Sequence, residues 1–219
     1  MTHTITGVGM TSQRTRSRMI TRLREQGIRD ERVLAAIAAV PRHVFVEEAL
    51  ASRAYEDTAL PLGFSQTISQ PYIVARMIEI LREGGRELGK TLEIGAGCGY
   101  QAAVLAQLTH EVYAVERIEP LLAKAKLNMR TIQQFKVRLK YADGNLGLPE
   151  ASPFDTIIVA AAASNVPQAL LQQLALGGRM LLPLGTGEQN LLLVERRAEG
   201  CVETRLDSVR FVPLLSGLE

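Results

Sequence analysis

Three glycines at alternating positions follow directly after an apolar segment of the chain. Gly95, Gly97 and Gly99 come after residues 92–94, and Tyr100 follows the third glycine. Glycine tolerates positive φ and carries no Cβ, so this spacing suits a tight strand-to-helix turn whose backbone amides lie against a bound molecule. The run therefore predicts a βα unit whose loop holds a nucleotide-type cofactor.

The spacing of these glycines distinguishes between two classes of cofactor. A dinucleotide fingerprint places its third glycine three residues after the second. Here Tyr100 occupies that position, and Gly99 instead gives the pattern G-x-G-x-G. This pattern favours S-adenosyl-L-methionine over NAD. Because glycine-rich turns without a ligand are common, the interpretation depends on residues elsewhere in the chain.

Length and composition are typical of one globular unit. The 219 residues suffice for one sizeable core and are few for two, so we expect a single domain over 1–219. The 47% hydrophobic and 22% charged residues are ordinary for a soluble protein. The apolar run 157–163 is too short for a membrane span, which needs ~20 residues, and the N-terminus lacks the pattern of a secretory signal. We therefore expect a cytoplasmic protein with no membrane partner.

Metal and nucleic-acid partners are not expected either. Cys98, Cys201 and three histidines are too few for a closed zinc site. The net charge of +2 lacks the imbalance of a dedicated nucleic-acid binder. Arginines crowd residues 14–29, but acidic residues dilute them and no aromatics interleave, which indicates a solvated helix face. The absence of heptads and of an apolar surface stripe favours a monomer.

Hydrophobic periodicity divides the chain into three parts. Residues 1–40 are expected to form an N-terminal helical cap, with helices over 12–26 and 30–39. Residues 41–89 form a loop-rich substrate region that ends in a helix over 72–81. From residue 90 onward, strand and helix patterns alternate, which predicts a mostly parallel, doubly wound α/β sheet.

The expected elements of this third part can be given by residue number. The strands are 91–94, 111–115, 137–141, 155–160 and 179–183, and the helices are 99–108, 119–130 and 166–175. Two further strand-like runs, 190–196 and 208–212, predict an antiparallel pair at one edge of the sheet.

Acidic side chains lie at three successive strands of this sheet, whose carboxyl ends are where ligands bind. Glu116 follows Gly99 by 17 residues, and a carboxylate there can accept bonds from both ribose hydroxyls. The pair Asp143-Gly144 follows the third strand and is placed to contact adenine. Glu93, inside the first strand, needs a partner when buried, such as the loop amides or the methionine ammonium of the cofactor.

Each acid also has a purely structural interpretation. Asp-Gly is a common turn, Glu116 can pair with Arg117, and Glu93 can stabilise its own loop. Taken singly, these interpretations are as good as the functional ones. Three acids at successive strand ends around one glycine loop favour a cofactor site, and the lack of a basic cluster suits a cofactor without phosphate that carries a positive sulfonium.

A second distinctive segment, Gln66-Thr67-Ile68-Ser69-Gln70-Pro71-Tyr72, places hydroxyl and amide side chains ahead of a helix. On its own it reads as a helix cap. Together with other motifs it makes the chain from residue 40 to 213 resemble the protein-L-isoaspartate O-methyltransferase family. The matching segments are 40–46, 54–57, 66–71, 92–100, 115–117, 143–144, 153–155, 177–179 and 212–214.

The resemblance implies a Rossmann-like class I methyltransferase that uses S-adenosyl-L-methionine to esterify the α-carboxyl of L-isoaspartyl residues in damaged proteins and peptides, after which the ester collapses to a succinimide. It implies that Ser69 is the active-site serine, and that the substrate is bound by Thr67, Ile68, Gln70, Pro71, Val212 and Pro213. The implied cofactor-binding residues are Glu93, Gly95, Gly97, Gly99, Glu116, Arg117, Asp143 and Gly144. The family often has a hydroxyl residue where this chain has Leu215, so no side-chain hydrogen bond is expected from that position.

The implied chemistry agrees with the scarcity of histidine. A carboxylate with a pKa near ~3.9 is already ionised at neutral pH, so methyl transfer to it needs no general base, and His43 is expected to be a structural neighbour. Three alternatives stay open at this point: a nucleic-acid or small-molecule methyltransferase, an NAD-dependent oxidoreductase and a noncatalytic binding module. The four alanines 160–163 replace the Asn/Asp-Pro-Pro-aromatic element that holds a flipped base, which disfavours base methylation.

Overall fold

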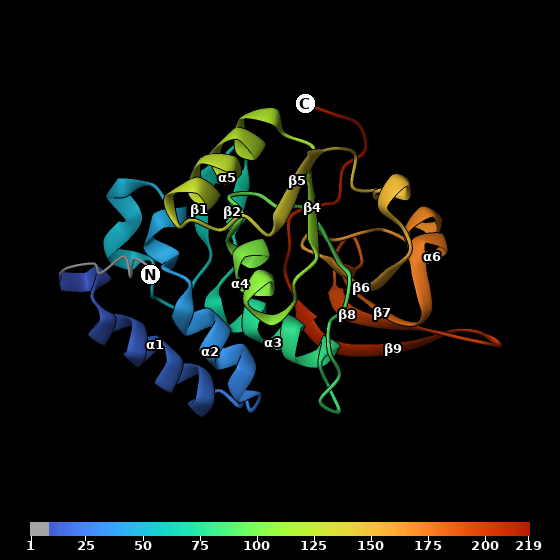
Figure 1. Ribbon diagram of the computed structural model, residues 1–219, viewed down its shortest axis with the longest axis horizontal. Coiled ribbons are helices and arrows are strands. Elements are labelled where there is room, and N and C mark those ends of the chain that lie inside the picture. Colours follow the sequence, from blue (N-terminus) through green and yellow to red (C-terminus); the bar gives the residue numbers. More distant parts are fainter. Residues whose placement is uncertain (1–8) are drawn as a thin grey trace.

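A seven-stranded sheet forms the centre of the computed structural model, which describes residues 9–219 (Figure 1). The strand order is β5-β4-β3-β6-β7-β8-β9. The parallel strands are β3 (Thr91–Ile94), β4 (Val112–Glu116), β5 (Val137–Tyr141), β6 (Phe154–Val159) and β7 (Leu174–Leu184), and β8 (Gln189–Arg197) and β9 (Gly200–Val209) are antiparallel. The chain leaves β3 toward β4 on one side and reaches β6 on the other, so the strand order reverses at β3. The predicted α/β class with a mostly parallel sheet is confirmed.

Two hydrophobic clusters pack against opposite faces of the sheet. One contains side chains from α1 (Gln13–Glu25), α2 (Glu31–Ala39), α3 (Pro71–Leu81), α4 (Tyr100–Leu108) and α5 (Glu119–Thr131). The other contains Leu170 of the short α6 (Gln168–Gln173) and the 3-10 turn Pro149–Ala151. β3 lies between them, and all four of its residues are buried. No helix within residues 9–219 is long and apolar enough to cross a membrane.

The N-terminal helices begin and end where simple local signals predict. Asp30 caps α2, because its side chain accepts hydrogen bonds from the amides of Arg32 (2.9 Å) and Val33 (3.2 Å). Pro71 occupies the first turn of α3, where a missing N–H costs nothing. The expected helices over 12–26, 30–39 and 72–81 therefore match α1, α2 and α3 to within a residue or two at each end.

The region expected to be mainly loop contains regular structure. Residues 42–45 and 48–53 form 3-10 helices, and β1 (Leu60–Gly63) pairs with β2 (Gln66–Ile68) in an antiparallel hairpin. The hairpin turn consists of Phe64 and Ser65, both at positive φ (52° and 54°). Such a turn is usually signalled by Asn-Gly or Asp-Gly, so the Phe-Ser pair gave no turn signal in the sequence.

Two predicted boundaries near the C-terminus are wrong. The last strand is β9 (Gly200–Val209) and not 208–212, because it turns back tightly from β8, with Arg197 opposite Gly200. Its side chains are mostly exposed, so hydrophobic alternation along it is weak. The expected helix 166–175 ends at Gln173, and β7 begins at Leu174 rather than at 179, because Leu174 already pairs with Phe154 of β6.

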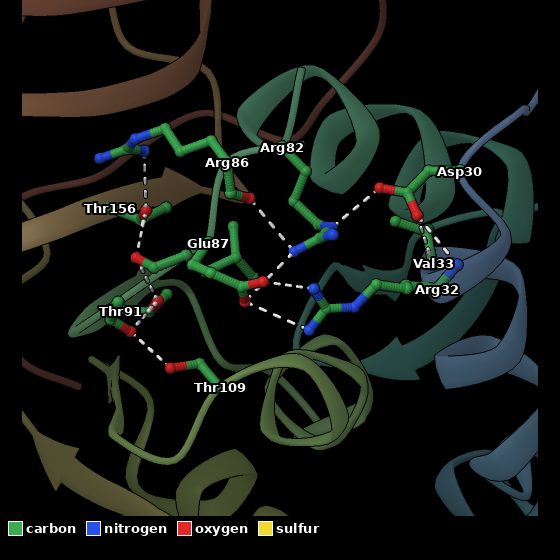
Figure 2. Close-up of polar contacts among 11 residues, drawn as sticks. Asp30, Arg32, Val33, Arg82, Arg86, Glu87, Thr91, Thr109 and Thr156 are labelled. Carbon is green, nitrogen blue, oxygen red and sulfur yellow. Dashed lines mark hydrogen bonds and ion pairs between the residues drawn. The ribbon is translucent and has the colours of Figure 1, made fainter. Parts of the chain in front are cut away.

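A polar network joins the helical cap to the sheet at the loop between α3 and β3 (Figure 2). Arg82 is 3% exposed, and its Nε donates to Asp30 Oδ2 at 2.8 Å while its Nη1 donates to the carbonyl of Arg86 at 3.2 Å. Arg32 forms an ion pair with Glu87 beside it. On the sheet side, Thr156 Oγ1 donates to the carbonyl of Leu88 at 2.6 Å. The loop is thus fixed at both of its ends.

Asp30 has two roles in this network, as the cap of α2 and as the partner of Arg82. Burial acts to raise its pKa, but the hydrogen bonds from Arg82 and from the amides of Val33 and Arg32 outweigh burial and lower it. Asp30 is therefore ionised at neutral pH, and Arg82 is its charged partner.

Replacing Arg82 with methionine is expected to lower the free energy of unfolding by about 2 kcal/mol, because it leaves the Asp30 carboxylate without its partner. This is less than the ~3–5 kcal/mol of a fully buried pair, since the Asp30 side chain is 20% exposed. Urea unfolding followed by circular dichroism measures the change. The control is Arg24→Met, which breaks the exposed pair with Glu31 and should leave stability unchanged. Equal stability of the two variants contradicts the assigned role of Arg82.

Candidate active site

A cavity lies at the carboxyl ends of β3 and β4, at the point where the strand order of the sheet reverses. It encloses about 850 Å³, its open mouth included. Three regions of the chain form its wall: the ends of the parallel strands, the β1–β2 hairpin with the loop that follows it, and the segment after β9. Predicted site residues that line it are Thr67, Ile68, Ser69, Glu93, Gly95, Gly97, Glu116, Arg117, Gly144, Val212 and Pro213.

The glycine loop turns sharply between β3 and α4. Gly95, Gly97 and Gly99 have φ values of 85°, 53° and 88°, a region that side chains rarely adopt. Gly95 and Gly97 line the cavity, whereas Gly99 lies outside its wall. A Cβ on Gly99 would lie 2.9 Å from Met129 Cε and 3.3 Å from Ala125 Cβ. The third glycine therefore permits close packing of α4 against α5, a different role from that of the first two.

Glu116 holds the glycine loop against the end of β4. Its Oε2 accepts from the amide of Gly97 at 2.8 Å, and its Oε1 accepts from the amide of Ile118 at 2.9 Å. Each carboxylate oxygen can accept a further bond, so contact with the ribose hydroxyls stays a prediction that the geometry permits. Arg117 does not pair with Glu116. Its Nε donates to the carbonyl of Gly217 at 2.8 Å, and its Nη1 pairs with Glu219 at 2.9 Å.

Glu93 places an unpaired carboxyl oxygen at the cavity. The residue is 1% exposed, and its Oε1 accepts from Gln101 Nε2 at 3.1 Å. Its Oε2 is buried and has no partner within residues 9–219. Burial, reinforced by the charge of Glu116, raises the pKa of Glu93 well above its usual range. A buried acceptor of this kind fits a cationic group such as an ammonium.

Ser69 faces the cavity from the loop between β2 and α3. Its Oγ makes no hydrogen bond to any residue that the structure describes, while its carbonyl accepts from Arg42 Nη2 at 2.6 Å. Thr67 and Ile68 line the cavity beside it, but Gln70 and Pro71 do not. Gln70 is the cap position of α3 and Pro71 its first residue, so their position in the structure is that of a helix start.

Asp143 bonds the C-terminal segment, and its contact with adenine stays a prediction. It is outside the cavity wall, and its Oδ2 accepts from the amide of Gly217 at 2.7 Å while its Oδ1 accepts from the amide of Asn145 at 2.8 Å. These bonds outweigh burial and lower the pKa of the carboxyl. The carboxylate therefore holds the C-terminal segment in place, and of the Asp143-Gly144 pair only Gly144 reaches the cavity. A Cβ on Gly144 would lie 2.5 Å from Ile94 Cγ2, so only glycine fits there.

The segment after β9 closes one side of the cavity. Ala162 donates to the carbonyl of Val212 and accepts from the amide of Leu214, both at 2.8 Å. This pairing places Val212, Pro213, Leu214 and Leu215 in the wall. Leu215 contributes an apolar, half-exposed side chain, in agreement with the absence of a hydroxyl in the sequence. His43 bonds Tyr55 OH through Nδ1 at 2.8 Å and does not line the cavity.

Several wall residues were missed by the sequence analysis. Leu62, Tyr100 and Gln101 line the cavity, and Arg42 contacts the Ser69 carbonyl from behind. Leu62 belongs to the unexpected hairpin. Arg42 did carry a signal, because it is a charged residue in an otherwise largely apolar segment, 40–46.

Comparison with known proteins assigns the chain to a family. Residues 14–219 match the family model of protein-L-isoaspartate(D-aspartate) O-methyltransferase. The chain belongs to this family. A protein-L-isoaspartate O-methyltransferase of Dechloromonas aromatica is 75% identical over 97% of this chain and 99% of its own length. A protein-L-isoaspartate O-methyltransferase of Azoarcus sp. is 66% identical over 94% of this chain and 95% of its own length.

Solved structures of the family share the fold. A structure of a protein-L-isoaspartate O-methyltransferase superposes with a TM-score of 0.83 and 29% identity, covering 93% of this chain and 67% of the other. A Plasmodium falciparum structure assigned to the same enzyme, in complex with S-adenosyl-L-homocysteine, has a TM-score of 0.80 at 23% identity, covering 91% and 97%. The resemblance drawn from the sequence motifs is confirmed, and the chain is not a member of a dinucleotide oxidoreductase family.

Replacing Glu93 with glutamine is expected to stabilise the ligand-free protein at neutral and alkaline pH. A carboxyl with a raised folded pKa keeps its proton in the folded state, while the unfolded chain releases it near ~4.3. Wild-type stability therefore falls as pH rises from the unfolded to the folded pKa, by at most ~1.4 kcal/mol per pH unit. Glutamine removes this loss.

The measurement is urea unfolding of the ligand-free protein at a series of pH values from about pH 5 to about pH 8, all above the unfolded pKa. Glu150→Gln, at an exposed position, should follow the wild-type pH dependence. Parallel pH profiles of the wild type and Glu93→Gln would show that the Glu93 pKa is not raised.

Proposed function

We propose that this chain transfers the methyl group of S-adenosyl-L-methionine to the α-carboxyl of L-isoaspartyl residues in damaged proteins and peptides, and so initiates repair through the methyl ester and succinimide. The observation that carries the proposal is that the Ser69 loop and the glycine loop both line the wall of one cavity. Membership of the family supports the choice of cofactor and substrate.

The cavity has the groups that this cofactor needs. Glu93 would accept a hydrogen bond from the methionine ammonium, which supplies the partner that its Oε2 lacks. Gly95 and Gly97 leave backbone against which the cofactor can lie, and Glu116 would accept bonds from the ribose hydroxyls. Ile118, Gly144 and Leu214 line the cavity and would hold the base. When bound, the cofactor supplies a methyl group on a positively charged sulfur.

The chain's own part in catalysis is to position the substrate and to exclude water. The substrate carboxylate is ionised at neutral pH, so no side chain has to remove a proton. Ser69 Oγ, free of other partners among the described residues, would donate to one carboxylate oxygen and leave the other directed at the methyl carbon. Fixing two reactants in such geometry can supply ~7–11 kcal/mol. Val212 and Pro213 would shape the groove for the peptide.

We also propose that the chain acts as a cytoplasmic monomer, folded as one unit over 1–219, without nucleic-acid or membrane partners. The modest net charge of +2 supports the lack of a nucleic-acid partner. Light scattering of the purified protein would give the mass of one chain, and a mass twice as large would overturn the monomer.

The experiment that tests the function compares two peptides that differ at one residue. Labelled methyl should pass from S-adenosyl-L-methionine to a peptide with L-isoaspartate and not to its twin with aspartate. The methylated product should be base-labile, as expected of an ester. Methylation of both peptides would indicate a general carboxyl methyltransferase, and methylation of neither would refute the proposal.

Ser69→Ala is expected to lower kcat about 10- to 100-fold, the value of one hydrogen bond of ~1.5–3 kcal/mol to a charged group. The dissociation constant of S-adenosyl-L-homocysteine should stay within about twofold, because Ser69 acts on the substrate carboxylate. Calorimetry and initial rates measure the two quantities. The control is Ser17→Ala, which removes an exposed hydroxyl on α1. An unchanged kcat in Ser69→Ala would remove this side chain from the mechanism.

A further inference from the structure

Arg42 is the largest fully buried side chain of the protein among residues 9–219, with 0% exposure. It begins the 3-10 helix that follows Pro41. Its Nε donates to the carbonyl of Ala54 at 2.8 Å, and its Nη2 donates to the carbonyl of Ser69 at 2.6 Å. Its guanidinium lies over the ring of Tyr100, 4.6 Å from the ring centroid.

Burying the Arg42 guanidinium has a free-energy cost that a role in stability alone does not explain. Arg42 forms no ion pair with any carboxylate of the described residues, and its Nη1 is buried without a hydrogen-bond partner. Burial lowers the pKa of the guanidinium, which shows the penalty on its charge. A well-packed apolar side chain can fill such a site at equal or lower cost. The buried arginine therefore needs an explanation other than stability.

The three groups that Arg42 contacts come from separate parts of the chain. Ala54 follows the 3-10 helix 48–53, Ser69 belongs to the loop between β2 and α3, and Tyr100 is the first residue of α4, directly after the glycine loop. Ser69 and Tyr100 both line the cavity. A guanidinium is planar and presents its donors in a fixed fork. It therefore fixes the distance between the carbonyl of Ser69 and the ring of Tyr100.

The position of Ser69 Oγ follows from this contact. Only one rotatable bond, χ1, separates the hydroxyl from the Ser69 backbone, and the hydroxyl itself has no partner among residues 9–219. A shift of the backbone is thus passed on directly to the group that would orient the substrate carboxylate.

We propose that Arg42 is a positioning residue that fixes the position of Ser69 relative to the glycine loop, and that it contributes to methyl transfer through Ser69. The proposal rests on the proposed function. Arg42 does not line the cavity, so its effect is on the alignment of the reactants and not on a direct contact with them.

The test is Arg42→Lys, which keeps the charge and removes the fork. A misplacement of ~1 Å can cost about 10²-fold in rate, so kcat should fall about 30- to 100-fold. The rate is counted per site that binds S-adenosyl-L-homocysteine, which corrects for unfolded protein. The dissociation constant of that ligand should stay within about threefold.

The matched control is Arg22→Lys. Arg22 likewise donates a short bond to a backbone carbonyl, that of Tyr55 at 2.6 Å, and has a buried Nε without a partner. It contacts neither Ser69 nor Tyr100. The control should lose stability as Arg42→Lys does, while its kcat per binding site stays within about threefold of wild type. Equal kcat values for the two lysine variants would overturn the proposal.

A double variant shows whether Arg42 acts through Ser69. In a protein that already carries Ser69→Ala, adding Arg42→Lys should lower kcat by at most about threefold relative to Ser69→Ala alone, because the hydroxyl to be positioned is gone. A kcat of the double variant that is reduced by the product of the two single reductions would overturn the proposal. Should Arg42→Lys not bind S-adenosyl-L-homocysteine, Arg42→Gln is measured in the same way, and failure of both would assign Arg42 to stability and refute the proposal. An inactive wild type would refute the proposed function instead.

Discussion

The bonds that hold the glycine loop at the end of β3 are the interaction on which the site depends. The amides of Gly95 and Ala96 both donate to the carbonyl of Val115, and the amide of Gly97 donates to the carboxylate of Glu116. The parallel ladder between β3 and β4 therefore continues into the turn. Since backbone amides and a buried carboxylate form these bonds, the loop has its shape before any ligand binds.

Two buried ionisable groups lie close to this loop, and each has a polar atom without a hydrogen-bond partner among residues 9–219. Within residues 9–219, Glu93 has a carboxyl oxygen without a hydrogen-bond partner and Arg42 forms no ion pair with a carboxylate. Groups of this kind destabilise a fold and persist where function requires them. In this protein the first faces the cavity and the second lies behind its wall, which suits a site that binds a cation and orients an anion.

The sequence predicted the parts of the structure whose signals are local. The glycine spacing, the apolar runs of the parallel strands and the Asp30 cap all depend on neighbouring residues. The hairpin with Phe64 and Ser65 was not predicted, because its turn lacks the usual residues. The bonds of Asp143 to the C-terminal segment and of Arg42 to Ser69 were not predicted either. Both join residues 27 or more positions apart, and a single sequence carries no pattern for such pairs.

The segment that Asp143 and Arg117 hold in place has a consequence for synthesis of the protein. Residues 212–215 complete the cavity wall, yet they follow all seven strands of the sheet in the chain. A nascent chain still lacking them on the ribosome has an open pocket. Ligand binding stabilises the form that carries the site, so any stabilisation that comes through contacts with residues 212–215 begins only when the C-terminal segment has been made.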